Sequence, residues 1–100
     1  MQKLVQIAKI LSDINRVKII ALMQREKELC VCEICDTLAL SQPLVSRHLK
    51  MMREAELVKT KQSGKWMIYS LTQNKMLNCL LEDLQEEFAT LPKVVACSRC

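Results

Sequence analysis

The spacing of apolar residues predicts four helices in the first half of the chain. Positions 4, 7, 8 and 11 form one apolar stripe, and positions 14, 17 and 21 form a second one after Ser12, a side chain suited to cap a helix. The second helix should end near residue 26, in a charged stretch, and a third should follow over residues 31–40. Ser41 and Pro43 favour the start of a fourth helix, because serine is a preferred N-cap and proline is tolerated in the first turn.

The pattern changes to that of β-structure after the fourth helix. Residues 58–62 and 66–71 are rich in β-forming side chains and flank a Ser-Gly pair, which predicts a hairpin. Apolar residues at helical spacing from Leu77 to Phe88 then indicate a last helix that ends before Pro92.

The expected order of elements is therefore α-α-α-α-β-β-α. It describes a mainly α domain with a β-hairpin over residues 1–91, followed by a short tail over residues 92–100. The first and last helices carry more apolar surface than a chain of this size needs for its own core, so a partner subunit is favoured.

Charge is unevenly distributed along the chain. The net charge is +4, with basic residues gathered between positions 47 and 65 and acidic ones between 82 and 87, a pattern that by itself indicates only two solvated faces. The fourth helix adds to this picture, because one of its faces carries donors suited to phosphates and base edges. These donors are Gln42, Ser46, Arg47, Lys50 and Arg53. Two helices joined by a short turn, the second rich in donors, indicate a helix-turn-helix.

The hairpin and the single histidine extend this predicted DNA-reading surface. Lys59, Lys61 and Lys65 place positive charge along the hairpin, and a basic hairpin after a helix-turn-helix is the pattern of a winged helix. His48 lies beside Arg47, and we expect it to contact DNA or to pack rather than to bind a metal, because no suitable ligand is spaced for it. Double-stranded DNA is the expected partner.

Three of the six cysteines lie within "CVCEIC", at positions 30, 32 and 35. The sequence shows no export signal and no stretch long enough to span a membrane, so we expect a cytoplasmic protein whose thiols act as ligands or sensors. On a helix, Cys32 and Cys35 share a face while Cys30 points elsewhere. A single ion therefore reaches all three only if Cys30 lies outside the first turn, in extended backbone, or if binding unwinds that turn.

The number and type of these ligands bear on which ion they bind. Three soft sulfurs suit a three-coordinate thiophilic ion such as As(III) or Sb(III), whereas structural zinc normally takes four ligands. Glu33, or a cysteine of the tail, is a possible fourth ligand for zinc, cadmium or lead. The start of a helix favours negative charge, so the thiols of Cys30 and Cys32 should ionise readily.

The remaining cysteines give weaker indications. Cys79 lies on the apolar last helix, where core packing is expected. Cys97 and Cys100 form a CxxC pair at the end of the chain, for which three interpretations stay open: a second metal site, extra ligands for the first, or a disordered terminus.

In order and spacing, "ELCVCEI", "SQPLVSRHL" and "GKWMIYSL" look like the metal-box, recognition-helix and wing motifs of one family. The chain resembles the ArsR/SmtB family of bacterial metalloregulatory repressors over nearly its whole length. The resemblance implies a homodimeric winged helix that binds a palindromic operator and leaves it when an inducer binds. "CVCEIC" is similar to the arsenic-responsive branch, which implies that Cys30, Cys32 and Cys35 hold As(III) or Sb(III).

Three alternatives to a metalloid-responsive repressor remain. One is a thiol redox or persulfide sensor on the same scaffold, and another is a repressor that answers to cadmium, lead or zinc. The third is a metal-buffering protein in which the DNA-binding features are incidental. Catalysis is not expected, because the sequence has one histidine, no recognisable nucleophile–base pair and no phosphate-binding loop.

Overall fold

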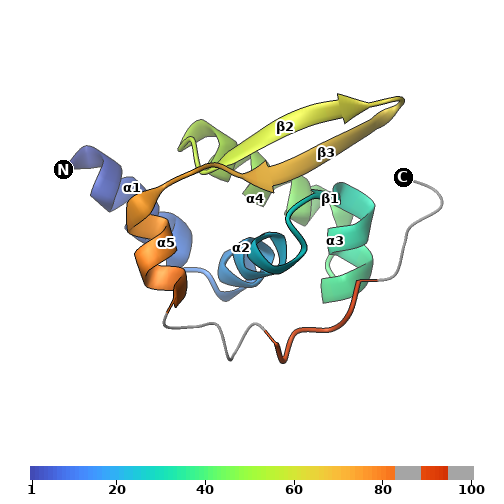
Figure 1. The fold of residues 1–100 in the computed structure, drawn as a ribbon, viewed down its shortest axis with the longest axis horizontal. Helices are drawn as coiled ribbons and strands as arrows, with labels where there is room; N and C mark the ends of the chain where they lie inside the picture. The colour runs from blue at the N-terminus through green and yellow to red at the C-terminus, as the bar shows by residue number, and fades with distance from the viewer. Residues whose placement is uncertain (83–88, 95–100) are drawn as a thin grey trace.

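The computed structural model describes residues 1–82 and 89–94 and places five helices and three strands within them (Figure 1). In chain order they are α1 (Gln2–Leu11), α2 (Ile14–Glu26), β1 (Leu29–Cys30), α3 (Val31–Leu38), α4 (Gln42–Glu54), β2 (Val58–Ser63), β3 (Trp66–Leu71) and α5 (Lys75–Glu82). The sequence prediction of a mainly α domain with a β-hairpin is confirmed. Among the described residues, no helix is both long enough and apolar enough to cross a membrane.

The helix starts follow local capping chemistry. Ser41 caps α4 as predicted, because its hydroxyl oxygen accepts a hydrogen bond from the Leu44 N–H at 3.4 Å. The prediction for α2 was wrong by one residue: Asp13 is the cap, and its carboxylate accepts hydrogen bonds from the N–H groups of Asn15 and Arg16. Ser12 instead ends α1.

The strands form one antiparallel sheet in the order β1-β3-β2. The hairpin β2–β3 was predicted, and its turn contains Gly64 at φ +62°, a left-handed conformation that glycine adopts without a steric penalty. The strand β1 was not predicted. Its Leu29 and Cys30 pair with Tyr69 and Ile68 of β3, so the first cysteine of "CVCEIC" belongs to the same sheet as the wing.

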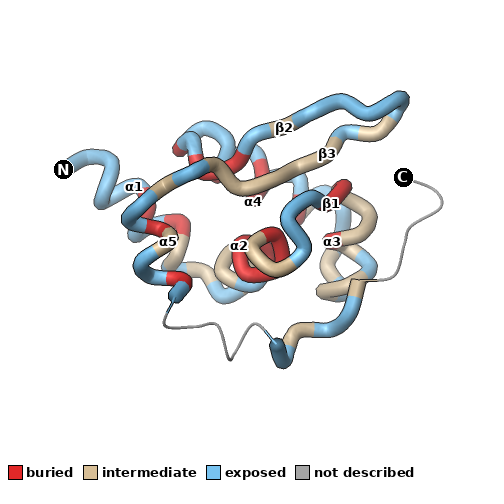
Figure 2. Tube along the Cα trace, viewed as in Figure 1, coloured by how far each residue is buried: buried red, intermediate tan, exposed pale blue. Residues whose placement is uncertain are grey.

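The core is built around α2, which runs through the middle of the molecule (Figure 2). The five consecutive residues 19–23 of this helix are all buried, and residues from every other helix pack in the same cluster. Against this core, α4 places Val45, Leu49 and Met52. The donor-bearing face of α4 is thereby held facing away from the core.

Apolar residues remain exposed on the first and last helices. Leu4 and Val5 of α1 are 53% and 54% exposed, and Leu80 of α5 is 48% exposed. Both helices lie at the end of the molecule opposite the tip of the hairpin (Figure 1). The prediction that Cys79 packs in the core was wrong, because its side chain is exposed on α5. The predicted continuation of this helix through Leu84 to Phe88 lies outside the described residues.

Candidate nucleic-acid interface and cysteine segment

The five polar donors predicted on α4 are all exposed. They are Gln42, Ser46, Arg47, Lys50 and Arg53. They share the helix with the buried residues that fix its orientation, so the helix is amphipathic over its full length. A helix with this arrangement presents a continuous row of hydrogen-bond donors, and the major groove of DNA is wide enough to admit it.

His48 does not belong to this row. Its side chain is 6% exposed, and among the described residues neither ring nitrogen has a hydrogen-bond partner. Burial lowers the pKa of the imidazole, and the positive charges of Arg16 and Arg47 lower it further, while the negative charge of Asp13 opposes them. His48 was expected either to contact DNA or to pack, and its burial favours packing, so we leave it out of the proposed DNA-reading set.

The wing lysines differ in their surroundings. Lys59 is exposed on β2. The ammonium of Lys61 lies 2.8 Å from a carboxylate oxygen of Glu28, the residue before β1. The ammonium of Lys65 lies 5.1 Å from the ring centroid of Trp66, within the range of a cation–π contact. All three side chains are exposed to solvent, so the wing presents a positive surface.

Cys30 occupies the N-cap of α3 in extended backbone, with φ −94° and ψ 165°. This is the first of the two geometries left open by the sequence. Its N–H donates a hydrogen bond to the carboxylate of Glu33 at 3.0 Å, which forms one half of a capping box. The same carboxylate was a predicted fourth metal ligand, so in this conformation it is already engaged at the helix start.

The three sulfurs of "CVCEIC" are not assembled into a site. Cys30 is buried, Cys35 is half-buried, and Cys32 is disulfide-bonded. Within residues 1–82 and 89–94, no group of three or more His, Cys, Asp or Glu side chains is arranged to hold a metal ion. A three-thiolate site therefore requires reduction of Cys32 and movement of at least one sulfur.

The protonation of Cys35 also bears on metal binding. Burial raises the pKa of this thiol, and the neighbouring carboxylate of Asp36 raises it further. Metals bind the thiolate, so capture of an ion by Cys35 must release a proton.

A small cavity lies between the cysteine segment, the start of α4 and the hairpin. Its volume is about 150 Å³, and its walls come from the start of α3, the first residue of α4 and the hairpin. The lining residues are Cys30, Val31, Cys32, Gln42, Lys65, Trp66 and Met67. The sequence did not indicate this contact, because the residues are brought together by the pairing of β1 with β3.

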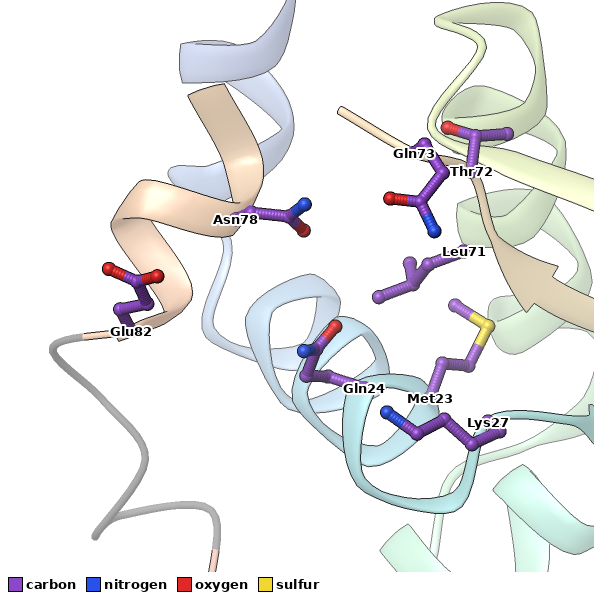
Figure 3. A pocket seen from close by; sticks show the side chains of 8 residues that line it. All are labelled: Met23, Gln24, Lys27, Leu71, Thr72, Gln73, Asn78 and Glu82. Atoms are coloured by element: carbon purple, nitrogen blue, oxygen red, sulfur yellow. The ribbon is translucent and has the colours of Figure 1, made fainter. Parts of the chain in front are cut away.

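A larger cavity of about 380 Å³ lies between α2, the end of β3 and α5 (Figure 3). It is lined by Met23, Gln24, Lys27, Leu71, Thr72, Gln73, Asn78 and Glu82, and none of the predicted site residues is among them. The side chains of Gln24, Gln73 and Asn78 converge on it from three segments of the chain. The predicted tail ligands Cys97 and Cys100 lie outside the described residues.

Comparison with known proteins identifies related sequences. A model of "Bacterial regulatory protein, arsR family" matches residues 13–60. The arsenical resistance operon repressor of Escherichia coli K12 is 44% identical over 68 residues, which cover 68% of this chain and 58% of that protein. The cadmium resistance regulatory protein CadC of Listeria innocua is 38% identical over 72 residues, covering 72% of this chain and 60% of that protein. This chain thus spans about three-fifths of the length of these two relatives.

Two further similarities extend over most of both chains. An HTH-type transcriptional regulator of Methanocaldococcus jannaschii is 32% identical over 75 residues, which cover 84% of that protein. The structure of HlyU from Vibrio cholerae N16961 matches with a TM-score of 0.75 and 28% identity, covering 89% of this chain and 95% of that one. The E. coli, L. innocua and M. jannaschii relatives are named as a repressor or as transcriptional regulators. The protein belongs to the ArsR family of bacterial regulatory proteins, with a winged-helix fold.

Proposed function

We propose that this protein is a homodimeric, cytoplasmic transcriptional repressor that binds a pseudo-palindromic operator and leaves it when As(III) or Sb(III) binds Cys30, Cys32 and Cys35. Gln42, Ser46 and Arg47 read base edges from α4. Contacts to phosphates come from Lys50, Arg53, Lys59, Lys61 and Lys65. The exposed donor row of α4 and the name of the E. coli relative support this proposal.

Exposed apolar side chains support the dimer. Leu4 and Val5 of α1 and Met76 and Leu80 of α5 are each 40% exposed or more, at one end of the molecule. A second copy that covered these residues would remove apolar surface from water and would set two α4 helices in a fixed relation. Two such helices fit a two-fold symmetric operator.

The position of Cys30 is the observation that carries the proposed switch. Cys30 is both the N-cap of α3 and a residue of β1, which pairs with the wing strand β3. When an ion draws its sulfur toward Cys32 and Cys35, the helix start and the strand must both shift. One displacement acts on α4 through its packing with α3, and the other acts on the wing through β3.

The choice of ion follows from ligand count. Three thiolates complete the coordination of trivalent arsenic or antimony, and the carboxylate of Glu33 is occupied at the N–H of Cys30. Cadmium, lead or zinc would need a further ligand from Glu33 or from the tail. The Listeria innocua relative is named as a cadmium resistance regulatory protein, which supports this alternative.

A second candidate function rests on the disulfide of Cys32. In this alternative, oxidation of a thiol pair replaces ion binding as the event that shifts the start of α3. It predicts that peroxide or polysulfide releases the protein from DNA in metal-free buffer and that a thiol reductant restores binding.

The test is fluorescence anisotropy of the fully reduced protein on DNA from immediately upstream of its own coding region. Arsenite, zinc and cadmium are titrated separately, with Cys32→Ser as the test variant and Cys79→Ser as a matched control outside the metal box. We expect arsenite to release wild type and Cys79→Ser, and to leave Cys32→Ser bound. A coupling of about 3 kcal/mol corresponds to roughly a hundredfold loss of affinity.

Other outcomes select the alternatives. Release by zinc or cadmium, with no response to arsenite, would assign a four-ligand site. Release only by oxidants would assign redox sensing. A protein with no saturable, sequence-specific DNA binding would be a metal-buffering protein.

A further inference from the structure

The ion pair between Lys61 and Glu28 connects the wing to the segment that precedes the cysteines. The Lys61 ammonium lies 2.8 Å from the Glu28 carboxylate, although the two residues are 33 positions apart. Glu28 immediately precedes β1, and Lys61 lies on β2, at the other edge of the sheet. The side chains therefore meet across the intervening strand β3.

The register of the sheet explains how the two groups meet. Lys61 and Cys30 are both directly opposite Ile68 of β3, one from each side. Residues directly opposite in an antiparallel sheet place their side chains on the same face. Lys61 and Cys30 thus share a face, and Glu28, two residues before Cys30, is within reach of the long lysine side chain.

The backbone around Glu28 is held in a tight turn. Lys27 has φ 75° and ψ −56°, and the Glu28 N–H donates a hydrogen bond to the Glu26 carbonyl at 2.9 Å. This is a γ-turn of the rare form with positive φ, which is strained for a residue other than glycine. The N–H of Lys27 also donates to the Met23 carbonyl at 2.8 Å. The carboxylate of Glu28 is therefore carried by a fixed backbone rather than by a long loop.

We infer that Glu28 is a positioning residue that limits operator affinity by competing with DNA phosphates for the Lys61 ammonium. The inference rests on the proposed contact between the wing and DNA. In free protein, Lys61 lies against Glu28; on DNA, the same ammonium exchanges to a phosphate and leaves the carboxylate without its partner near a negatively charged duplex.

The exposure of the pair makes this exchange feasible. The side chains of Lys61 and Glu28 are 62% and 53% exposed, so water screens their attraction and the pair is weak. A pair of this kind changes an equilibrium by about 1.5- to 5-fold. Glu28 should therefore reduce affinity for DNA modestly without preventing binding.

The experiment is a double-mutant cycle on operator affinity over a range of salt concentrations, with Glu28→Gln, Lys61→Gln and the combined variant. Glu26→Gln is the matched control, because Glu26 is two residues away and pairs with Arg25 rather than with the wing. Thermal unfolding of each variant checks that the fold is retained. We expect Glu28→Gln to strengthen binding about 1.5- to 5-fold in wild type and by clearly less in the Lys61→Gln background.

Three results would overturn the inference. An equal gain from Glu28→Gln in both backgrounds, or the same gain from Glu26→Gln, would show a general effect of removing negative charge. No gain from Glu28→Gln while Lys61→Gln weakens binding would show that the ion pair does not compete. Unchanged affinity and salt dependence in Lys61→Gln would remove this lysine from the interface, and with it both the inference and the proposed wing contact.

Discussion

The two helices of the helix-turn-helix are built differently. Helix α3, in which we propose the sensor lies, has 8 residues, begins at a cysteine in extended backbone and fully buries Ile34 alone. Helix α4, which we propose reads DNA, has 13 residues, begins at a serine cap with proline in its first turn, and buries four side chains. Short helices are marginal without tertiary contacts. The start of α3 can therefore rearrange at a smaller cost than α4, which places the proposed sensor in the more adaptable element.

The C-terminal ends of the two helices also differ in backbone conformation. α3 ends at Ala39 in a left-handed conformation, with φ 55°, whereas α4 ends at Ala55 with φ −84°. A left-handed conformation is unfavourable for alanine because its Cβ crowds the following carbonyl oxygen. Helix α3 therefore ends in a strained conformation, whereas α4 does not.

Arg47→Ala should have the largest effect among the changes that test α4. Loss of a bidentate contact to a base costs about 1–3 kcal/mol of discrimination against the wrong sequence. The measurement compares affinity for operator and for scrambled DNA, with Lys18→Ala, an exposed change on α2, as control. Operator preference that survives unchanged in Arg47→Ala would show that this arginine does not read bases.

Ser41→Ala tests how much the serine N-cap stabilises α4. Loss of the cap should lower the free energy of unfolding by about 1 kcal/mol, because the Leu44 N–H loses its acceptor. Urea unfolding measures this, and Ser46→Ala, an exposed change inside the same helix, should cause no such loss. Equal stability of the two variants would mean that the serine cap does not stabilise α4.

The buried imidazole of His48 should make stability depend on pH. Because folding lowers the pKa of this group, the unfolded chain binds the proton more readily, and stability falls as pH drops below the ordinary histidine pKa of about 6.5. His48→Phe keeps an apolar ring and should lose less stability between pH 7 and pH 5 than wild type does. Identical pH dependence of the two proteins, measured by urea unfolding, would contradict the neutral, buried ring.

Ala39→Gly should have the smallest effect and the opposite sign. Removal of the Cβ relieves the left-handed conformation at residue 39, which should stabilise the folded state by about 1–2 kcal/mol. Glycine also gives the unfolded chain more freedom, which opposes this gain by about 0.4–1 kcal/mol. We therefore expect the free energy of unfolding to rise by about 0.5 kcal/mol. Ala8→Gly in the exposed middle of α1 should instead cost about 1 kcal/mol. A loss of stability in Ala39→Gly would show that the turn is not strained.

The sequence predicted the long, well-patterned elements and missed the short one. β1 has two residues, too few for any periodicity, and it exists because Leu29 and Cys30 pair with a strand nearly forty positions later. Local pattern also left the position of Cys30 open between two geometries, since only the tertiary structure decides which residue is the cap of α3.

For two single side chains, the helical spacing predicts burial or exposure more sharply than we used it. Val45, His48 and Leu49 are related by steps of three and four, so His48 lies on the buried stripe of α4 despite its polar character. Cys79 is two positions from the buried Leu77 and therefore points away from the core side of α5. For both residues, the position along the helix decides whether the side chain is buried.

In the proposed mechanism, arsenite rearranges the start of α3 and leaves α4 folded. The most direct test is hydrogen–deuterium exchange of the reduced protein with and without stoichiometric arsenite. We predict faster exchange at the amides of residues 31–34 when arsenite is bound, and retained protection across the middle of α4. Unchanged exchange at residues 31–34, or loss of protection within α4 itself, would contradict the assignment of sensing to the start of α3.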